Sequence, residues 1–392
     1  MTGLLTDVMH DRADALDAPD LDVAAMVRDG EHRAGRRRVV GLVGLTAASL
    51  VIAAGITLPA LLSGDARDAD VSAPVVSYDL AYAVGSTIHD GSRTVETDVR
   101  ISALVQGPSG YVVADPQGRV HTVVDGESTQ VGQLAETDRG RLVSDDDVVA
   151  WVDAAGAGTL SVLDLATGDR VDVPVAELPG EPVSRNDAGR IGGAGAHVAA
   201  VDGRTVYVTD ARGVMAWDAL DGEDPALLAA PDGVEAQVLD VRDGQVLQVA
   251  RAFEARETDG STTMVQVEEL RVGPDLQDTR SLPGVGGRLS PDGRRAALYD
   301  LVSRRRDLPS YDTTVVGEVS GDSWTSVAPR GVDSVLAYQW LDADTFAARA
   351  GSYTADSARE DLLSCEASTG DCTVVVRGVP DELVPATGWM SP

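Results

Sequence analysis

The sequence predicts an all-β fold, preceded by one helix long enough to cross a membrane. Short valine-rich runs recur along the chain and are separated by glycine, aspartate and proline, a pattern typical of strands joined by turns. A separate uncharged stretch near the N-terminus has the length of a membrane span. Hydrophobic residues make up 43% of the 392 residues but aromatic ones only 4%, so we expect a core of Val, Leu and Ala.

Residues 1–38 form a leader with apolar side chains at helix-like spacing, among them Leu4, Leu5 and Val8. Such an amphipathic helix could bind a cytoplasmic partner, and the alternative is a largely disordered tail, because isolated short helices are marginal in water. The segment LDVAAMVRDGEHRAGRRR (21–38) resembles the tails of actinobacterial single-span proteins, including anti-sigma-factor-like ones. The resemblance implies a sigma-factor-like partner, but the His-x3-Cys-x2-Cys zinc motif of such domains is absent.

Residues 39–62 (VVGLVGLTAASLVIAAGITLPALL) carry no charge and are long enough, at roughly 1.5 Å per residue, to cross the bilayer core. Arg33 and Arg36, Arg37 and Arg38 precede this stretch, whereas acidic residues follow it. Positive residues stay inside, so we expect a single-pass membrane protein with its N-terminus in the cytoplasm, bilayer contact through 39–62 and a stalk over 63–77. A cleaved signal peptide and a buried core helix are the alternatives.

Residues 78–392 contain a repeated unit of four strands. The clearest copy, residues 141–175, reads RLVS, turn DDD, VVAWVDA, loop AGAG, TLSVLDL, turn ATGD, RVDVPV. Five further copies cover 101–134, 197–230, 237–282, 286–328 and 336–377. Four-stranded units at spacings of roughly 40–55 residues predict a β-propeller of six to seven blades. A hairpin at 80–98 and a strand within 382–389 could form a seventh blade closed by both chain ends.

The SPDG turn at 290–293, followed by a strand, is similar to the repeat of TolB-type and WD40-like propellers, and this resemblance extends over about 78–377. It implies a propeller fold but no particular activity, because propellers host many. We expect the turn itself to be structural, since Pro, Asp and Gly each favour a turn position.

The loops between second and third strands are short in the first three units and long in the last three, at 253–262, 303–312 and 351–360. Consecutive long loops would form one wall on the same face of a propeller, and they carry Arg and aromatic residues, which are enriched at recognition surfaces. The candidate binding residues on this loop face are Phe253, Arg256, Arg304, Arg305, Arg306, Tyr311, Tyr353 and Arg359. The alternative is a set of solvated loop tips without a partner.

The two cysteines, Cys365 and Cys372, flank a predicted turn, so they could face each other across a hairpin and form a disulfide. No further Cys or nearby His completes a zinc ligand set. A disulfide would place this end of the chain in an oxidising compartment, in agreement with the orientation inferred from the arginines.

The net charge of −31 argues against nucleic-acid binding, which needs a basic surface. The sequence contains no Walker A loop, G-x-S-x-G elbow, H-E-x-x-H motif or complete EF-hand, and we predict no cofactor and no metal site. The predicted function is a membrane-anchored, extracytoplasmic, non-catalytic binding or scaffolding module for a protein or envelope ligand. The alternatives are an envelope hydrolase or lyase with carboxylates in the propeller mouth, and a regulator acting through its tail.

Overall fold

The computed structural model describes most of the chain from residue 77 to residue 387. The described ranges are 77–135, 141–154, 158–175, 196–210, 212–222, 224–258, 261–301, 312–354, 357–380 and 382–387. The predicted leader and membrane span, and the stalk up to residue 76, lie outside these ranges. Across the described ranges the regular elements are strands, and no helix there is long and apolar enough to span a membrane.

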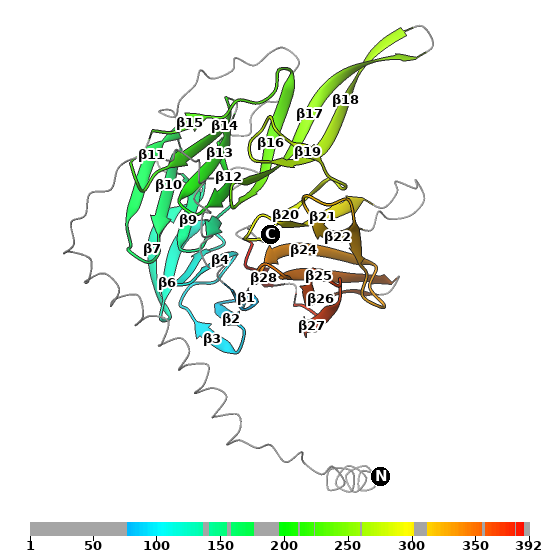
Figure 1. Cartoon of the computed structure of the whole chain (residues 1–392). Helices are drawn as coiled ribbons and strands as arrows, with labels where there is room; N and C mark the ends of the chain where they lie inside the picture. The colour runs from blue at the N-terminus through cyan, green and yellow to red at the C-terminus, as the bar shows by residue number, and fades with distance from the viewer. Residues whose placement is uncertain are drawn as a thin grey trace, which may run out of the picture. The chain divides into compact units, whose positions relative to one another are not determined.

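The described strands form seven antiparallel sheets of four strands each, which are the blades of a propeller (Figure 1). Blades 2 to 4 contain β4 (Ala103–Gly107), β5 (Gly110–Ala114), β6 (Arg119–Val124), β7 (Glu127–Gln133), β8 (Val143–Asp145), β9 (Val148–Asp153), β10 (Thr159–Asp164), β11 (Arg170–Pro174), β12 (His197–Asp202), β13 (Thr205–Asp210), β14 (Gly213–Asp218) and β15 (Ala226–Leu227). Blades 5 to 7 contain β16 (Val234–Arg242), β17 (Gln245–Thr258), β18 (Ser261–Gly273), β19 (Arg280–Ser281), β20 (Gly286–Leu289), β21 (Arg295–Leu301), β22 (Asp312–Glu318), β23 (Trp324–Val327), β24 (Ser334–Trp340), β25 (Thr345–Thr354), β26 (Ser357–Glu366) and β27 (Cys372–Val376). The six predicted repeat units correspond to these six blades.

Blade 1 is built from both ends of the propeller. Its strand order is β28-β1-β2-β3, with β1 (Ala81–Val84), β2 (Thr87–Asp90), β3 (Arg93–Glu96) and β28 (Leu383–Pro385). The late strand β28 is innermost and pairs with β1, with Ala83 opposite Val384. The predicted seventh blade, closed by both chain ends, is therefore confirmed.

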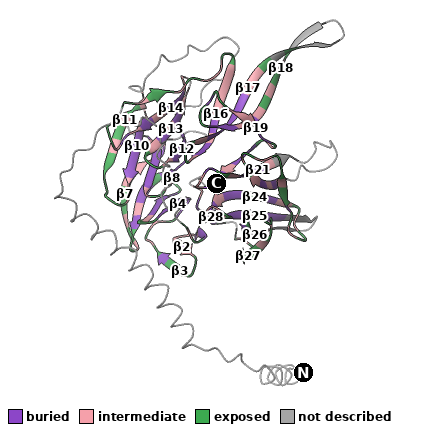
Figure 2. Cartoon of the chain, viewed as in Figure 1, coloured by how far each residue is buried: buried purple, intermediate pink, exposed green. Residues whose placement is uncertain are grey.

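The core lies between neighbouring blades and has the predicted aliphatic composition. Between blades 3 and 4, for example, Val162 and Val208 pack with Met215 and Trp217. Figure 2 shows that buried residues follow the inner strands of the blades, whereas exposed residues gather toward the outer strands. The ring closes where Leu80 and Leu383 of blade 1 pack against blade 7. Each blade thus buries its faces against its neighbours rather than within itself.

Acidic residues in the first-to-second-strand turns join neighbouring blades. Asp147 of blade 3 accepts hydrogen bonds from the backbone N–H and the hydroxyl of Ser109 in blade 2, both at 2.9 Å. Asp202 of blade 4 accepts the backbone N–H groups of Asp243 (2.9 Å) and Gly244 (3.0 Å) in blade 5. Part of the chain's acidity therefore binds turn amides across the boundaries between blades.

The SPDG turn has the geometry that its residues predict. The N–H of Gly293 donates to the carbonyl of Ser290 at 2.8 Å, and Gly293 has a φ of 64°. A Cβ atom at this position would lie 2.6 Å from the carbonyl oxygen of Arg242 in the neighbouring blade. Glycine is required here both by the left-handed backbone and by the close approach of blade 5.

Two of the three predicted long loops are instead continuous strands. Strands β17 and β18 remain paired up to Thr258 opposite Ser261, and β25 and β26 up to Thr354 opposite Ser357. The expectation of loops at 253–262 and 351–360 was wrong because the pairing of both hairpins continues beyond Ala252 and Gly351, the last residues that pair with an inner strand. Most of the third segment, 303–312, lies outside the described residues.

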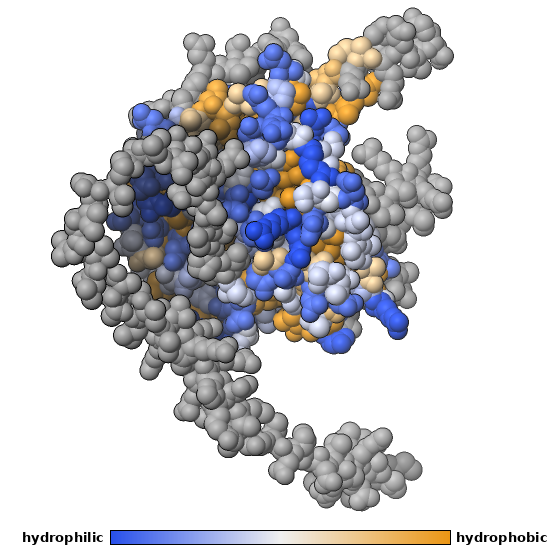
Figure 3. All heavy atoms as spheres, in the orientation of Figure 1, coloured by the Kyte–Doolittle hydropathy of each residue, from blue (hydrophilic) through white to orange (hydrophobic). Residues whose placement is uncertain are grey.

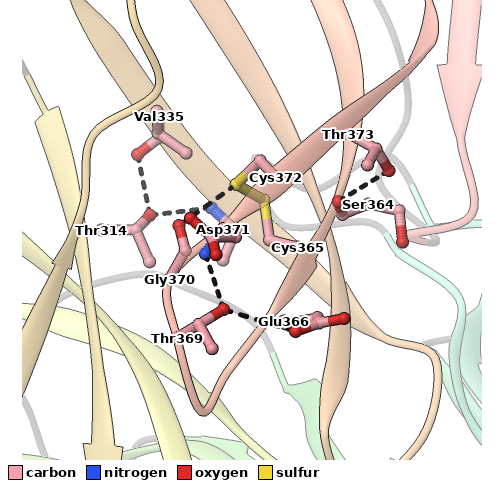
Figure 4. The surroundings of a disulfide bond; sticks show 11 residues. Thr314, Val335, Ser364, Cys365, Glu366, Thr369, Gly370, Asp371, Cys372 and Thr373 are labelled. Carbon is pink, nitrogen blue, oxygen red and sulfur yellow. Dashed lines mark hydrogen bonds between the residues drawn. A yellow bond between two sulfur atoms is a disulfide. The ribbon is translucent and has the colours of Figure 1, made fainter.

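The predicted disulfide is present in blade 7. Cys365 near the end of β26 lies opposite Cys372 at the start of β27, and their sulfur atoms are bonded (Figure 4). The turn between them is closed by backbone hydrogen bonds from Gly370 to Glu366 (2.8 Å) and from Glu366 to Asp371 (2.9 Å). The bond thus closes a hairpin whose strands are already in register.

Candidate functional site

The structure describes only some of the predicted loop-face residues. Phe253 lies in β17, and 60% of its surface is exposed. Arg256, Tyr353 and Arg359 lie in strands β17, β25 and β26 rather than in loops, and their side chains are outside the described part. The remaining candidates, Arg304, Arg305, Arg306 and Tyr311, also lie outside the described residues. A binding role for these eight residues stays a prediction.

Strands β17 and β18 continue beyond the blade as a two-stranded ribbon (Figure 1). The inner strand β16 ends its pairing where Val234 lies opposite Ala252, so residues 253–258 and 261–266 pair only with each other among the described residues. We call residues 253–258 with 261–269 the ribbon. It lies on the face of the propeller that carries the second-to-third-strand connections.

One face of the ribbon carries two large apolar side chains. Phe253 lies opposite Gln266 and Ala255 opposite Met264, so all four side chains project on the same side of the ribbon. Met264 is 60% exposed, as is Phe253. Figure 3 shows hydrophobic surface along this ribbon, next to the undescribed tip. Exposed aromatic and Met side chains are typical of recognition surfaces.

A second candidate site lies on the opposite face, where the inner strands end around the propeller axis. A cavity of about 110 Å³ opens there. Its lining comes from blades 1, 2, 3, 5, 6 and 7 and includes Tyr78, Gln106, Arg141, Asp145, Asp146, Asp240, Arg242, Arg288, Pro291, Tyr338 and Gln339. We call this cavity the channel mouth. Pro291, which the sequence predicts to act only in its turn, lines this cavity.

The charged groups of the channel mouth neutralise one another. Arg242 lies 3.1 Å from Asp145 and 3.8 Å from Asp240, and it also donates to the carbonyl of Val201. Burial alone would lower the pKa of Arg242, but Asp145 and Asp240 outweigh burial and raise it, so the guanidinium stays charged. Asp240 also accepts the backbone N–H of Leu289 at 3.0 Å. The network therefore links blades 3, 4, 5 and 6.

Irregularities in the inner strands explain the other two arginines of the channel mouth. Strands β12 and β16 contain register shifts, between Val198 and Ala200 and between Val238 and Asp240. A bulge leaves a residue outside the regular ladder. The carbonyls at these two bulges, those of Ala199 and Leu239, accept hydrogen bonds from Arg141 and Arg288. No motif in the sequence signals these contacts, because donor and acceptor come from different blades.

Tyr78 and Asp146 form the least neutralised part of the channel mouth. The Tyr78 hydroxyl donates to Asp146 at 3.1 Å. Burial and, next, Asp146 raise the pKa of Tyr78, so the phenol stays protonated. Burial and the nearby Asp145 raise the pKa of Asp146, although the hydrogen bond from Tyr78 opposes the shift. In the described ranges no group of three or more His, Cys, Asp or Glu is arranged to hold a metal ion.

No family model and no curated protein matches this sequence. Among solved structures, the chain is similar to TolB from Acinetobacter baumannii, with 16% identity over 73% of this chain and 66% of that one, at a TM-score of 0.32. It is similar to BamB from Moraxella catarrhalis (13% identity, 70% and 79%, TM-score 0.38) and to the GH74 xyloglucanase from Xanthomonas campestris (16%, 78% and 54%, TM-score 0.44). These low TM-scores carry no argument about function, and the propeller assignment rests on the seven sheets themselves.

Proposed function

We propose that this protein is a membrane-anchored, non-catalytic binding module whose propeller lies outside the cytoplasm and recognises a partner protein through the ribbon. The observation that carries the proposal is the exposure of Phe253 and Met264 on one face of that ribbon. Burying large apolar side chains of this kind contributes roughly 1.5–3 kcal/mol each. A bare two-stranded hairpin is marginal in water, so a partner that covers it would also stabilise it.

The carboxylates of the channel mouth favour a structural role over a catalytic one. A general acid and base need carboxyl groups that can exchange protons, but Asp240 accepts a backbone N–H and faces two arginines. Asp145 is held by Arg242 and by the N–H of Gly203 at 2.7 Å. Asp146 accepts the Tyr78 hydroxyl at 3.1 Å, and burial raises its pKa. This set of engaged carboxylates favours a structural role for the network over a hydrolase or lyase mechanism.

The sequence supports the membrane part of the proposal through the uncharged stretch 39–62 and the arginines before it. Tyr78, the second described residue, lines the channel mouth, so the chain enters the propeller on that face. The leader, 1–38, then lies in the cytoplasm, where a sigma-factor-like partner is its proposed contact.

A photo-crosslinking experiment tests the ribbon. A photoreactive phenylalanine analogue at position 253 of the full chain, activated in cells, should give a discrete adduct with one other protein. The same analogue at Val375, which is 50% exposed on β27, is the matched control and should give none. Met264→Asp should abolish the adduct from position 253 because it places a charge in the apolar contact. Equal adducts from both positions, or none from position 253, would refute the proposal.

The disulfide allows a test of the orientation. In intact cells, a membrane-impermeant reductant followed by an impermeant thiol tag should label Cys372, the partly exposed member of the pair, because the proposal places it outside the cytoplasm. A single cysteine introduced at Asp20, in a Cys365→Ala and Cys372→Ala background, should be labelled only after the cells are permeabilised. The reverse labelling pattern would overturn the proposed topology, and labelling of all sites in intact cells would do the same.

A further inference from the structure

We propose that the outer edge of β18 accepts an extended segment of a partner protein as an additional β-strand. The inference rests on the ribbon being the binding surface, as proposed above, and it adds the chemistry of the partner. An unpaired row of backbone N–H and C=O groups recognises another extended chain through main-chain hydrogen bonds.

The outer edge of β18 is covered only near the blade. Strand β19 pairs with Arg271 and Val272, and the N–H of Leu282 donates to the carbonyl of Leu270 at 2.8 Å. Between Ser261 and Glu269, no strand of the described part pairs with this edge. The carbonyl of Leu270 points outward, and in an antiparallel ladder the direction alternates along the strand. The N–H and C=O groups of every second residue therefore also point outward, namely those of Glu268, Gln266 and Met264.

The outer edge of β18 lacks the residues that usually protect an edge strand from pairing with another chain. Natural edge strands are guarded by lysine, proline, inward-pointing charges or bulges. Residues 262–267 read TTMVQV, with no charge and no proline, and the pairing with β17 runs through them without a bulge. Thr, Val and Met favour extended backbone. The paired stretch of β17 has Glu254, Arg256 and Glu257 in its sequence, so the uncharged strand of the ribbon is β18 over 262–267.

The two faces of the ribbon specify the side chains of the added strand. Phe253, Ala255 and Met264 share one face near the tip, which suits apolar residues there, and the Arg251–Glu268 ion pair follows on the same face nearer the blade. On the other face Glu269 is already paired with Arg271, so a basic residue is favoured by the net charge of −31 of the whole chain rather than by a free carboxylate on the ribbon. Side chains of a strand alternate between faces. The matching occupant is therefore an extended segment in which apolar and basic residues alternate.

A second copy of this chain does not fit the edge. The protein carries a net charge of −31 and contains no lysine, so two copies repel each other at low ionic strength. The same charge attracts a basic segment and speeds its encounter with the ribbon. The occupant is thus a different protein, and its contact weakens as salt is added.

A defined peptide tests this inference without knowledge of the natural partner. The probe is a fluorescent peptide of about ten residues in which valine and arginine alternate, and its control has the same composition in two blocks. With the full chain, the alternating peptide should bind and the block peptide should bind at least about tenfold more weakly, because only the alternating one presents a separate face to each side of the ribbon. Failure of the alternating peptide to bind, or equal binding of both peptides, overturns the inference.

Two substitutions at one position separate strand addition from side-chain contact. Gln266→Pro removes an N–H that points outward and leaves the hydrogen bonds to β17 intact. Edge strands tolerate proline where the N–H faces solvent, so this position should accept it. Gln266→Ala shortens the same side chain but keeps the N–H. Loss of one hydrogen bond should weaken peptide binding about tenfold for Gln266→Pro, whereas Gln266→Ala should stay within about twofold of the original chain. Unchanged thermal unfolding of both variants confirms that the propeller is intact.

Amide hydrogen exchange gives an independent readout. On addition of the alternating peptide, the N–H groups of Met264, Gln266 and Glu268 should become protected, while those of Val265 and Val267, already directed at β17, should change little. If Gln266→Pro binds the peptide as well as the original chain does, strand addition is refuted, but an adduct from position 253 would still uphold the proposed function. If position 253 gives no adduct, the proposed function fails whatever the peptide does.

Discussion

At the scale of single residues, Arg242 connects more of the propeller than any motif in the sequence suggests. Its guanidinium lies between Asp145 of blade 3 and Asp240 of its own blade, and it donates to a carbonyl of blade 4. A charged group buried in this way is tolerated only while its partners remain, since each bare charge bears a large desolvation penalty. The stability of the channel mouth should therefore depend on this side chain.

We predict that Arg242→Met lowers the free energy of unfolding by about 3 kcal/mol, because Asp145 and Asp240 lose their shared cation. Chemical denaturation measures the change. The matched control is Arg93→Met, since Arg93 and Asp125 form an exposed pair at 3.8 Å whose loss should change stability by less than about 1 kcal/mol. Adding Asp240→Asn to Arg242→Met should recover part of the loss. Equal effects of the two arginine substitutions would contradict the assigned role.

The structural roles of some single residues could be predicted from the sequence, and those of others could not. The turn residues Pro291 and Gly293 were predictable because proline and glycine act through their own backbone. The arginine contacts were not, because Arg141 and Arg288 bond to carbonyls exposed by bulges in other blades. A bulge has no reliable sequence signal in a run of Val, Ala and Leu, so its partner cannot be identified before the fold is known.

At the scale of elements, the four-strand repeat was accessible from the sequence because each blade alternates short apolar runs with strong turn residues. Residues 253–262 were misassigned as a loop, whereas the described backbone there is that of two paired strands, with Phe253 opposite Gln266 and Thr258 opposite Ser261. The Asp259-Gly260 pair between runs of β-forming residues is the signal that identifies a hairpin here.

The disulfide hairpin, unlike the hairpin of 253–262, was predicted correctly from the sequence. Cys365 and Cys372 were predictable as partners because a turn of four residues, 368–371, places its flanking strands side by side. Cys365 is fully buried between blade 7 and its neighbour. On the chain-entropy description, closing a loop this short stabilises the fold by about 2 kcal/mol. The bond therefore reinforces an outer strand that has few other buried contacts.

At the scale of the whole molecule, the ring depends on a strand that lies far from its partners in the sequence. Strand β28 buries Leu383 and Val384, which are 3% and 2% exposed, between blade 1 and the adjoining blades. The sequence suggested this closure because a lone hairpin at 80–98 and a lone strand at 382–389 remained after the complete repeats were assigned. The alternative of six blades failed because neither piece can bury its apolar side chains alone.

We predict that deleting residues 378–392 lowers the free energy of unfolding by at least about 4 kcal/mol, since roughly 2 kcal/mol is lost for each of Leu383 and Val384. Calorimetry should also show a broader transition, because blade 1 loses its innermost strand. Deleting only residues 388–392, which lie outside the described strands, is the matched control and should leave the transition in place. A propeller that unfolds identically with and without β28 would contradict the assigned closure.

The same closure imposes an order on biosynthesis. Strands β1, β2 and β3 leave the ribosome before any other part of the propeller, yet their innermost neighbour is made after the other six blades are complete. Until then the nascent chain exposes the inner edge of β1 and the apolar side chains of Ala81 and Ala83. Blades 2 to 7 can pair locally as they emerge, whereas the first blade is finished last. The start of the propeller is therefore the segment most in need of a chaperone during translation.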